Sequence, residues 1–190
     1  MSKDGQMAKI DSNNLVWIDL EMTGLDASCN QILEIASIVT DSNLNIIAEG
    51  PELVIHCPES KLEKMDDWNQ THHKASGLWQ RAVSSKITVK QAEEQTLEFI
   101  KQYCSPQKNP LCGNSIGQDK LFLLSEMPKI TDFLHYRVID VSSIKELVTR
   151  WYPSGSTAFI KKGEHRALAD IKESIEELKH YRDKYFLPDS

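Results

Sequence analysis

Acidic side chains close a predicted strand near the start of the chain. The apolar run 15–18 is typical of a strand buried on both faces, and Asp19 and Glu21 follow directly. Because side chains alternate along a strand, these two carboxylates share one face at its end. An isolated pair is explained by a solvated strand end. Acids that end an apolar strand must nevertheless be solvated, paired or bound to metal, so half of a metal site is the alternative.

Two more carboxylates and a histidine stand at the starts of predicted helices. Asp119 opens a helix after the loop 113–117, and Asp170 lies one turn into the last helix, on the opposite side from much of its apolar stripe. Taken singly, Asp119 is explained by the helix dipole and Asp170 by a solvated helix face. His165, five residues before Asp170, is explained singly by a structural or exposed role.

Together, these four carboxylates and the histidine meet the needs of phosphodiester hydrolysis. Two divalent ions about 3.5–4 Å apart, held by carboxylate oxygens, can clamp the attacking and leaving oxygens of an in-line displacement. A histidine that titrates near neutrality can take the proton from the attacking water. The residues alone therefore indicate a metal-dependent hydrolase.

The elements that must position these residues can be read from apolar periodicity and turn signals. Stretches 31–40 and 44–56 are rich in Ile, Val and Leu and predict an antiparallel meander with the first strand, 14–21. Capping boxes predict helices from Ser60 to about Trp68 and from Thr88 onward. The remaining predicted elements are a short apolar stretch at 111–112, a helix at about 118–127, a strand at 136–141, a helix capped by Ser143 and ending at Trp151, and a helix at about 164–184. This order predicts an α/β domain with a mixed sheet.

Composition limits the functional classes. The chain has 190 residues, which suits one domain, and a net charge of −6, so no global positive field attracts nucleic acid. Bound cations or local patches must then attract any polyanion. The four cysteines lie far apart, and residues 1–13 hold no apolar segment typical of export. We expect free thiols, a cytoplasmic location and no membrane partner.

Three segments, 17–26, 113–119 and 165–170, resemble the three motifs of the DEDDh 3′→5′ exonucleases. Segments 21–25 and 135–142 are similar to the branch of that family that degrades very short RNAs. The resemblance implies a single ribonuclease H-like domain, a mixed β-sheet flanked by α-helices. It places that exonuclease domain at 14–186, after an N-terminal tail at 1–13.

The resemblance also implies a site. It assigns two divalent ions, Mg²⁺ or Mn²⁺, to ligands from all four motif carboxylates, which are Asp19, Glu21, Asp119 and Asp170. His165 becomes the general base. Leu25 and Trp68 stack on or wedge the bases, which is reasonable because aromatic–base stacking tolerates any sequence. Ser115 contacts the RNA backbone. Without the resemblance, Trp68 would be interpreted as a core or edge aromatic.

The family is homodimeric, and a partner subunit completes each site. The resemblance implies that four residues reach across the dimer. Tyr136 completes the catalytic centre of the partner, and the other three cap the 5′ phosphate of a dinucleotide, namely Arg137, Ser142 and His73. An arginine suits a phosphate because its guanidinium binds two oxygens at once. His73 is chosen over His72 by its spacing of five from Trp68. The implied substrate is short single-stranded RNA, cut to nucleoside 5′-monophosphates.

Two other functions remain open at this point. One is a different DEDDh activity, a proofreading-type DNA exonuclease or a tRNA-trimming nuclease, against which segment 135–142 argues. The other is a non-catalytic nucleic-acid-binding module on the same fold, which would have no chemical need for the five catalytic positions.

Overall fold

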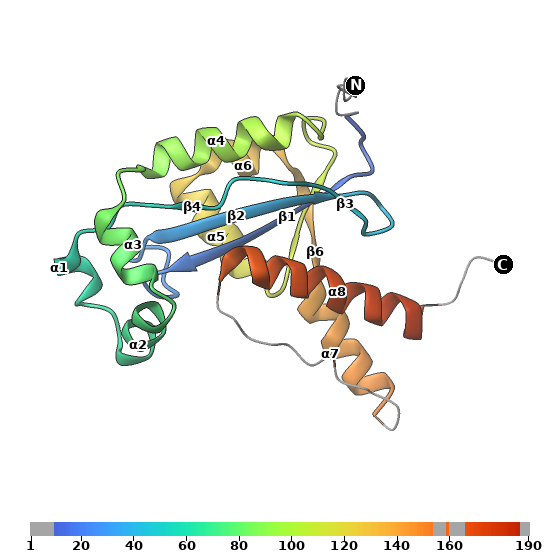
Figure 1. The fold of residues 1–190 in the computed structure, drawn as a ribbon. Coiled ribbons are helices and arrows are strands. Elements are labelled where there is room, and N and C mark those ends of the chain that lie inside the picture. Colours follow the sequence, from blue (N-terminus) through green and yellow to red (C-terminus); the bar gives the residue numbers. More distant parts are fainter. Residues whose placement is uncertain (1–9, 154–158, 160–165, 187–190) are drawn as a thin grey trace, which may run out of the picture.

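A twisted sheet forms the centre of the molecule. The computed structural model describes residues 10–153, 159 and 166–186. The strand order is β3-β2-β1-β5-β6, with β4 paired to β2 (Figure 1). The strands are β1 (Leu15–Met22), β2 (Ile32–Thr40), β3 (Ile46–Glu49), β4 (Leu53–Val54), β5 (Pro110–Gly113) and β6 (His135–Asp140). The predicted meander of the first strands is confirmed, but stretch 44–56 is two strands, interrupted at Gly50 and Pro51.

The pairing of β1 decides which side chains share a face. β1 is antiparallel to β2 and parallel to β5, so the sheet is mixed, as predicted. Glu21 lies opposite Glu34, and Asp19 lies opposite Ala36. Residues directly opposite each other in an antiparallel pair point to the same side of the sheet. Asp19, Glu21 and Glu34 therefore share one face.

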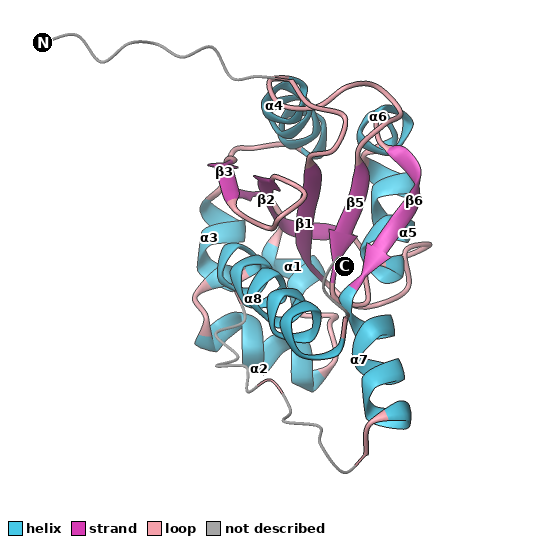
Figure 2. Cartoon of the chain, turned by 90° about the vertical axis from the view of Figure 1, so that its right-hand side faces the viewer, coloured by secondary structure: helices cyan, strands magenta, loops and turns pink. Residues whose placement is uncertain are grey.

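Helices cover both faces and one end of the sheet. They are α1 (Glu59–Leu62), α2 (Asp67–Ala75), α3 (Leu78–Ser84), α4 (Val89–Lys101), α5 (Gly117–Glu126), α6 (Pro128–Phe133), α7 (Val141–Trp151) and α8 (Ala167–Tyr185). Figures 1 and 2 show α4, α5 and α6 on one side of the sheet, α8 on the other, and α1 to α3 beyond the end of β1. The fold is the predicted single domain, a mixed sheet flanked by helices.

Each face has its own apolar core. Val16, Ile18 and Leu20 pack toward α4, α5 and α6, whereas Trp17 packs toward α7 and α8 with Ile171 and Ile175. Along the second face, β1 changes from the apolar Trp17 to the acidic Asp19 and Glu21. The face that holds α8 is therefore apolar beneath the body of this helix and acidic beneath its start.

Several helix boundaries differ from the prediction. The capping box at Ser60 is wrong, because α1 starts after Pro58 without a side-chain cap and ends at Leu62. Asp66 then caps α2 by accepting from the Asn69 amide. Trp68 therefore stands in the first turn of α2 rather than at the end of a longer helix. Pro128, expected only to end α5, also begins α6, since proline suits the first position of a helix.

The start of α7 also differs from the prediction. Its N-cap is Asp140, whose side chain accepts from the Ser142 amide at 2.9 Å, and not Ser143. The capping box at Thr88 and Gln91 is confirmed at the start of α4. Within the described part of the chain, we find no helix with the length and apolar character needed to cross a bilayer.

Candidate active site

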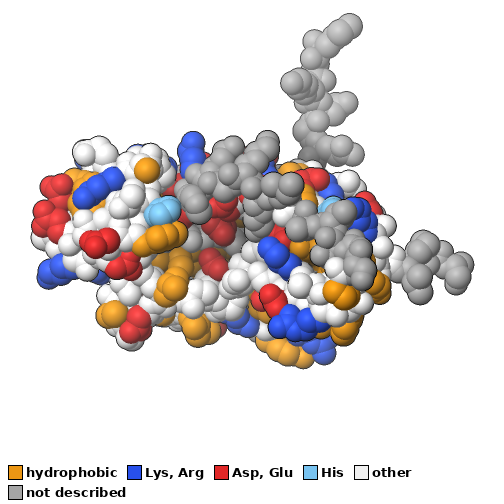
Figure 3. Space-filling view, turned by 90° about the horizontal axis from the view of Figure 1, so that it is seen from below, with side chains coloured by type: hydrophobic (Ala, Val, Ile, Leu, Met, Phe, Trp, Pro, Cys, Tyr) orange, Lys and Arg blue, Asp and Glu red, His pale blue; other side chains and the backbone are white. Residues whose placement is uncertain are grey.

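Three carboxylates from two elements form a cluster. Asp19 and Glu21 come from the end of β1 and Asp170 from the first turn of α8, and one oxygen of each lies within 4.8 Å of the others. The packing of α8 on β1 and β2 brings Asp170 to this place. Figure 3 shows acidic side chains gathered in the middle of this side of the molecule. The structure thus brings together three of the four predicted metal ligands.

Asp119 approaches the same end of β1 from the other face of the sheet. It lies in the first turn of α5, is buried, and its Oδ1 accepts a hydrogen bond of 3.1 Å from the Leu20 amide. Leu20 stands between Asp19 and Glu21, so this bond ties α5 to the acidic end of β1. Asp119 also adds its charge to the surroundings of Glu21.

The electrostatics of the cluster call for a cation. Burial, as the largest cause, and the nearby carboxylates of Asp170, Glu34 and Asp119 together raise the pKa of Glu21 to about 8, while Arg81 opposes them. Burial likewise raises the pKa of Asp119 to about 7. Such crowding of carboxylates becomes favourable when a divalent cation neutralises them. Their hard oxygen donors fit Mg²⁺ or Mn²⁺.

The predicted general base, His165, lies outside the described residues. Arg166, the next residue, is described and is the N-cap residue of α8. Its carbonyl oxygen accepts from the Asp170 amide at 2.9 Å.

The two predicted stacking residues are exposed apolar side chains near the end of β1. Leu25, in the loop after β1, is 73% exposed, and Trp68 is 59% exposed. The Leu25 carbonyl accepts a hydrogen bond from the Gln118 side chain of α5, which fixes the loop. Large apolar side chains held out to solvent favour a binding surface over a core role.

His72, which the sequence gave no reason to choose, stacks its ring against the indole of Trp68. The two rings are stacked with centroids 3.7 Å apart and planes 24° apart. His72 Nδ1 also donates to the Trp68 carbonyl oxygen at 2.7 Å. Their spacing of four on one helix face was the signal that could have identified the pair.

His73 has a structural contact in the same chain. It is 3% exposed, and its Nε2 donates to the Met22 carbonyl oxygen at 2.9 Å. Burial lowers its pKa, which favours a neutral ring. This bond ties α2 to the end of β1, so within one chain His73 positions the surface that carries Trp68. The predicted contact of His73 with a phosphate stays a prediction.

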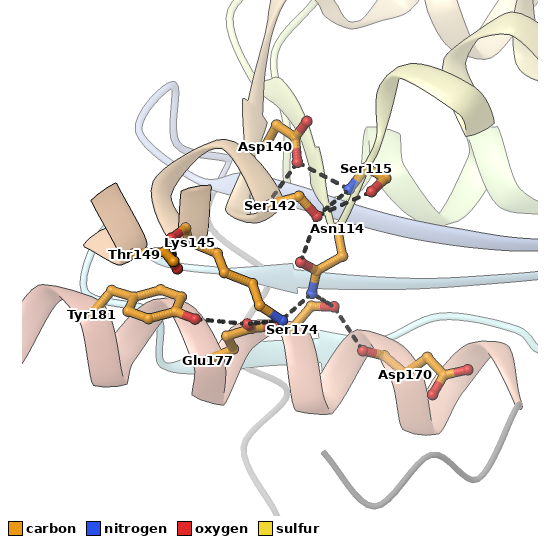
Figure 4. Close-up of polar contacts among 10 residues, drawn as sticks. All are labelled: Asn114, Ser115, Asp140, Ser142, Lys145, Thr149, Asp170, Ser174, Glu177 and Tyr181. Carbon is orange, nitrogen blue, oxygen red and sulfur yellow. Dashed lines mark hydrogen bonds and ion pairs between the residues drawn. The ribbon is translucent and has the colours of Figure 1, made fainter. Parts of the chain in front are cut away.

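Ser115 and Ser142 are neighbours within one chain. Their hydroxyl oxygens lie 3.0 Å apart, and the Ser115 amide donates to both Ser142 Oγ and Asp140 Oδ1, at 3.0 and 2.9 Å (Figure 4). Ser115 has a φ of 50°, a left-handed conformation that is uncommon without glycine, and these bonds hold it there. Ser142 therefore lies beside Ser115 of its own chain, and its predicted contact with a 5′ phosphate across the dimer stays a prediction.

Asn114 connects this serine pair to α8. Its side-chain oxygen accepts from Ser142 Oγ, and its nitrogen donates to Ser174 Oγ and Glu177 Oε2 at 2.8 and 3.0 Å. Ser174 in turn donates to the Asp170 carbonyl oxygen at 2.8 Å. Figure 4 shows that a continuous network joins the loop after β5, the start of α7 and helix α8, which carries Asp170.

The remaining predicted residues, Tyr136 and Arg137, lie on the outer strand β6. Tyr136 is 71% exposed, and the Arg137 guanidinium lies 5.4 Å from the centre of its ring. A cleft beside Tyr136 is lined by Lys120 and Leu124 of α5 and by Thr131 of α6. The structure places these two residues at the surface of β6, apart from the three-carboxylate group.

Comparisons with known proteins agree with this fold and site. The exonuclease family RNase_T matches residues 16–178, so the chain belongs to this exonuclease family. It is 56% identical over 173 residues to an oligoribonuclease of Vibrio cholerae and 55% identical over 174 residues to one of Marinobacter nauticus. The matches cover 91% and 92% of this chain and 96% and 97% of those relatives. Within the exonuclease family, the chain therefore belongs to the oligoribonucleases.

Solved structures confirm the fold at low sequence identity. Escherichia coli exonuclease I in complex with a 5cy-dT13 oligonucleotide superimposes with a TM-score of 0.71 at 15% identity, and exonuclease I of Methylocaldum szegediense with 0.64 at 17%. The matches cover 91% and 90% of this chain, but the chain spans only 41% of each of those two. The ribonuclease H-like fold is thereby confirmed.

Proposed function

We propose that this chain is a 3′→5′ exoribonuclease that cuts short RNAs, dinucleotides above all, to nucleoside 5′-monophosphates. The observation that carries the proposal is the carboxylate cluster of Asp19, Glu21 and Asp170 at the end of β1. The exposed Leu25 and Trp68 follow the same strand end in the chain. A hydrolytic site beside a sequence-tolerant stacking surface suits an enzyme that removes terminal nucleotides. The substrate class comes from the oligoribonucleases to which the chain is more than half identical.

The carboxylates and the histidine divide the chemistry. Asp19, Glu21, Asp119 and Asp170 hold two divalent ions, Mg²⁺ or Mn²⁺. When bound, these ions activate water and neutralise charge on the scissile phosphate. Asp119 also keeps its hydrogen bond to Leu20 and so holds α5 against β1. His165 takes the proton from the attacking water.

The other predicted residues select a short substrate. Leu25 and Trp68 stack on the bases, and Ser115 contacts the RNA backbone. Arg137, Ser142 and His73 cap the 5′ phosphate, which leaves no room for a further nucleotide. Tyr136 completes the catalytic centre of a partner subunit in a homodimer. In support, Tyr136 and Val138 expose apolar surface on the outer strand β6, and the adjoining helix α7 exposes Leu147 and Trp151. A cytoplasmic location stays a prediction.

The test is turnover of 5′-labelled RNAs of two to about seven nucleotides, with Mg²⁺ and with EDTA, beside DNA of matching length. We expect metal-dependent cleavage that is fastest on the shortest RNA. Faster cleavage of long RNA or of DNA would move the chain to another exonuclease activity, such as that of the DNA-bound structural neighbour. Binding without cleavage would support a non-catalytic module.

A further inference from the structure

A chain of charged side chains runs from the middle of the sheet to the start of α8. Arg81 of α3 binds both carboxylate oxygens of Glu34, at 3.3 and 3.1 Å. Glu52, between β3 and β4, lies 3.7 Å from Arg81 and 3.0 Å from the Arg166 guanidinium. We call this series, Glu34, Arg81, Glu52 and Arg166, the ionic bridge.

One end of the ionic bridge lies beside the carboxylate cluster. Glu34 stands opposite Glu21 in the β1–β2 pair, on the same face of the sheet. It is 1% exposed, and a buried carboxylate needs partners, which the two-pronged contact with Arg81 provides. This end is therefore fixed within the sheet, directly next to a predicted metal ligand.

The other end fixes the first turn of α8. Arg166 is the N-cap residue of this helix, and its carbonyl oxygen accepts from the Asp170 amide. Its guanidinium is at the same time held by Glu52. The ionic bridge therefore connects the strand that opposes Asp19 and Glu21 with the helix turn that carries Asp170.

A metal site made of Asp19, Glu21 and Asp170 requires that the first turn of α8 be held in place on the sheet. Asp170 stands in the first turn of α8, within 4.8 Å of Asp19 and Glu21, whereas the apolar contacts of Ile171 and Ile175 hold the helix further along. We propose that Glu52 and Arg166 are positioning residues, which hold Asp170 at metal-binding distance from Asp19 and Glu21 through the anchor of Arg81 on Glu34. This inference rests on the proposed function, in which these carboxylates hold metal ions.

The test replaces Glu52 by glutamine, which keeps its size and removes its charge. We expect Glu52→Gln to weaken Mn²⁺ binding, measured by calorimetry without substrate, by about fivefold, and to lower kcat on a diribonucleotide by about three- to tenfold, because small displacements of ligands are costly. KM should change little, since the stacking surface is untouched. The thermal midpoint should also change little, because partly exposed ion pairs contribute little stability.

Glu49→Gln is a matched control. Glu49 of β3 pairs with Lys172 of α8 at 2.9 Å, so it too joins the sheet to this helix by a partly exposed ion pair, but Lys172 lies beyond Asp170. This variant should keep the Mn²⁺ affinity and kcat of the original chain. Equal losses in both variants would show a general effect of helix docking and overturn the proposal.

A double variant and amide exchange complete the test. Arg166→Gln should cause losses similar to those of Glu52→Gln, and the double variant should lose no more than Glu52→Gln alone, because Arg166 acts through its contact with Glu52. Hydrogen exchange at the Asp170 amide should speed up in all three. Unchanged Mn²⁺ affinity in Glu52→Gln, or additive losses, would overturn the proposal. If the chain cut no RNA, the proposed function would fail, yet Mn²⁺ affinity and amide exchange would still decide the positioning role.

Discussion

Asp119 combines two roles in one carboxylate. One oxygen accepts from the buried Leu20 amide, and the group also lies close enough to Glu21 to raise its pKa. Its proposed role as a metal ligand can therefore be tested separately from its role in holding α5 against β1. Asparagine keeps an oxygen that can accept from Leu20, whereas alanine removes both the charge and the acceptor.

We expect Asp119→Asn to lower turnover of a diribonucleotide by about a hundredfold or more, through loss of a metal ligand, with little change in the thermal midpoint. Asp119→Ala should be as inactive and also less stable by about 1–3 kcal/mol, because the Leu20 amide is left unpaired. Initial rates and thermal unfolding of both variants test this. Substantial activity in Asp119→Asn would contradict the ligand role.

His72 illustrates a functional contact that one sequence does not single out. Its ring lies under Trp68, so the exposed indole is held flat rather than free to rotate. We expect His72→Ala to raise KM for short RNA by about threefold to tenfold, with kcat nearly unchanged, because a less ordered indole stacks less well on bases. His72→Phe, which keeps an aromatic ring below Trp68, should restore most of the affinity. A KM unchanged by His72→Ala would mean that Trp68 needs no support.

At the scale of elements, the sequence predicted most of the strands and the long helices, but not the break between β3 and β4 or the short helices. The apolar run before Asp19 predicted β1, and the capping box at Thr88 predicted the start of α4, because each signal depends only on residues that are neighbours in the sequence. By contrast, Asp66 caps α2 and Asp140 caps α7, and neither is followed by a capping-box partner that would reveal it. The proximity of Asp19 and Asp170 depends on how α8 packs across β1, which no local pattern encodes.

Asp140 links an element boundary to the site. It caps α7 by accepting from the amide of Ser142, a predicted 5′-phosphate contact, and it also accepts from the amide of Ser115, a predicted contact to the RNA backbone. We expect Asp140→Ala to cost about 1 kcal/mol of stability, as loss of an N-cap does. It should also raise KM for a 5′-phosphorylated dinucleotide more than for its 5′-hydroxyl counterpart.

Thr88→Ala provides the control for this prediction. It removes the cap of α4, whose apolar residues pack on the opposite face of the sheet from α8. It should cost a similar free energy of unfolding and leave KM for both dinucleotides unchanged. If Asp140→Ala affected the two dinucleotides equally, its cap role would remain and its role in phosphate binding would be wrong.

At the scale of the whole molecule, most of the predicted site residues that the structure describes lie in two regions. The carboxylates, Leu25 and Trp68 belong to the end of β1 and the elements around it, whereas Tyr136 and Arg137 lie on the outer strand β6. The exposed apolar side chains of β6 and α7 give that second region the character of a contact surface. A homodimer that places β6 of one chain near the carboxylates of the other would unite the two sets.

This arrangement can be tested by mixing two inactive variants. Asp119→Asn damages the metal site of its own chain, and Tyr136→Ala damages the site of the partner if Tyr136 acts across the dimer. After subunit exchange, a mixed dimer has one site with an intact Asp119 and an intact Tyr136 from opposite chains. With equal amounts, about half of the dimers are mixed and each has one working site, so activity should recover to about a quarter of that of the original chain.

Recovery should require exchange of subunits and be lost when exchange is blocked. If Tyr136 acts within its own chain, each mixed dimer contains one chain that lacks Asp119 and one that lacks Tyr136, and no activity returns.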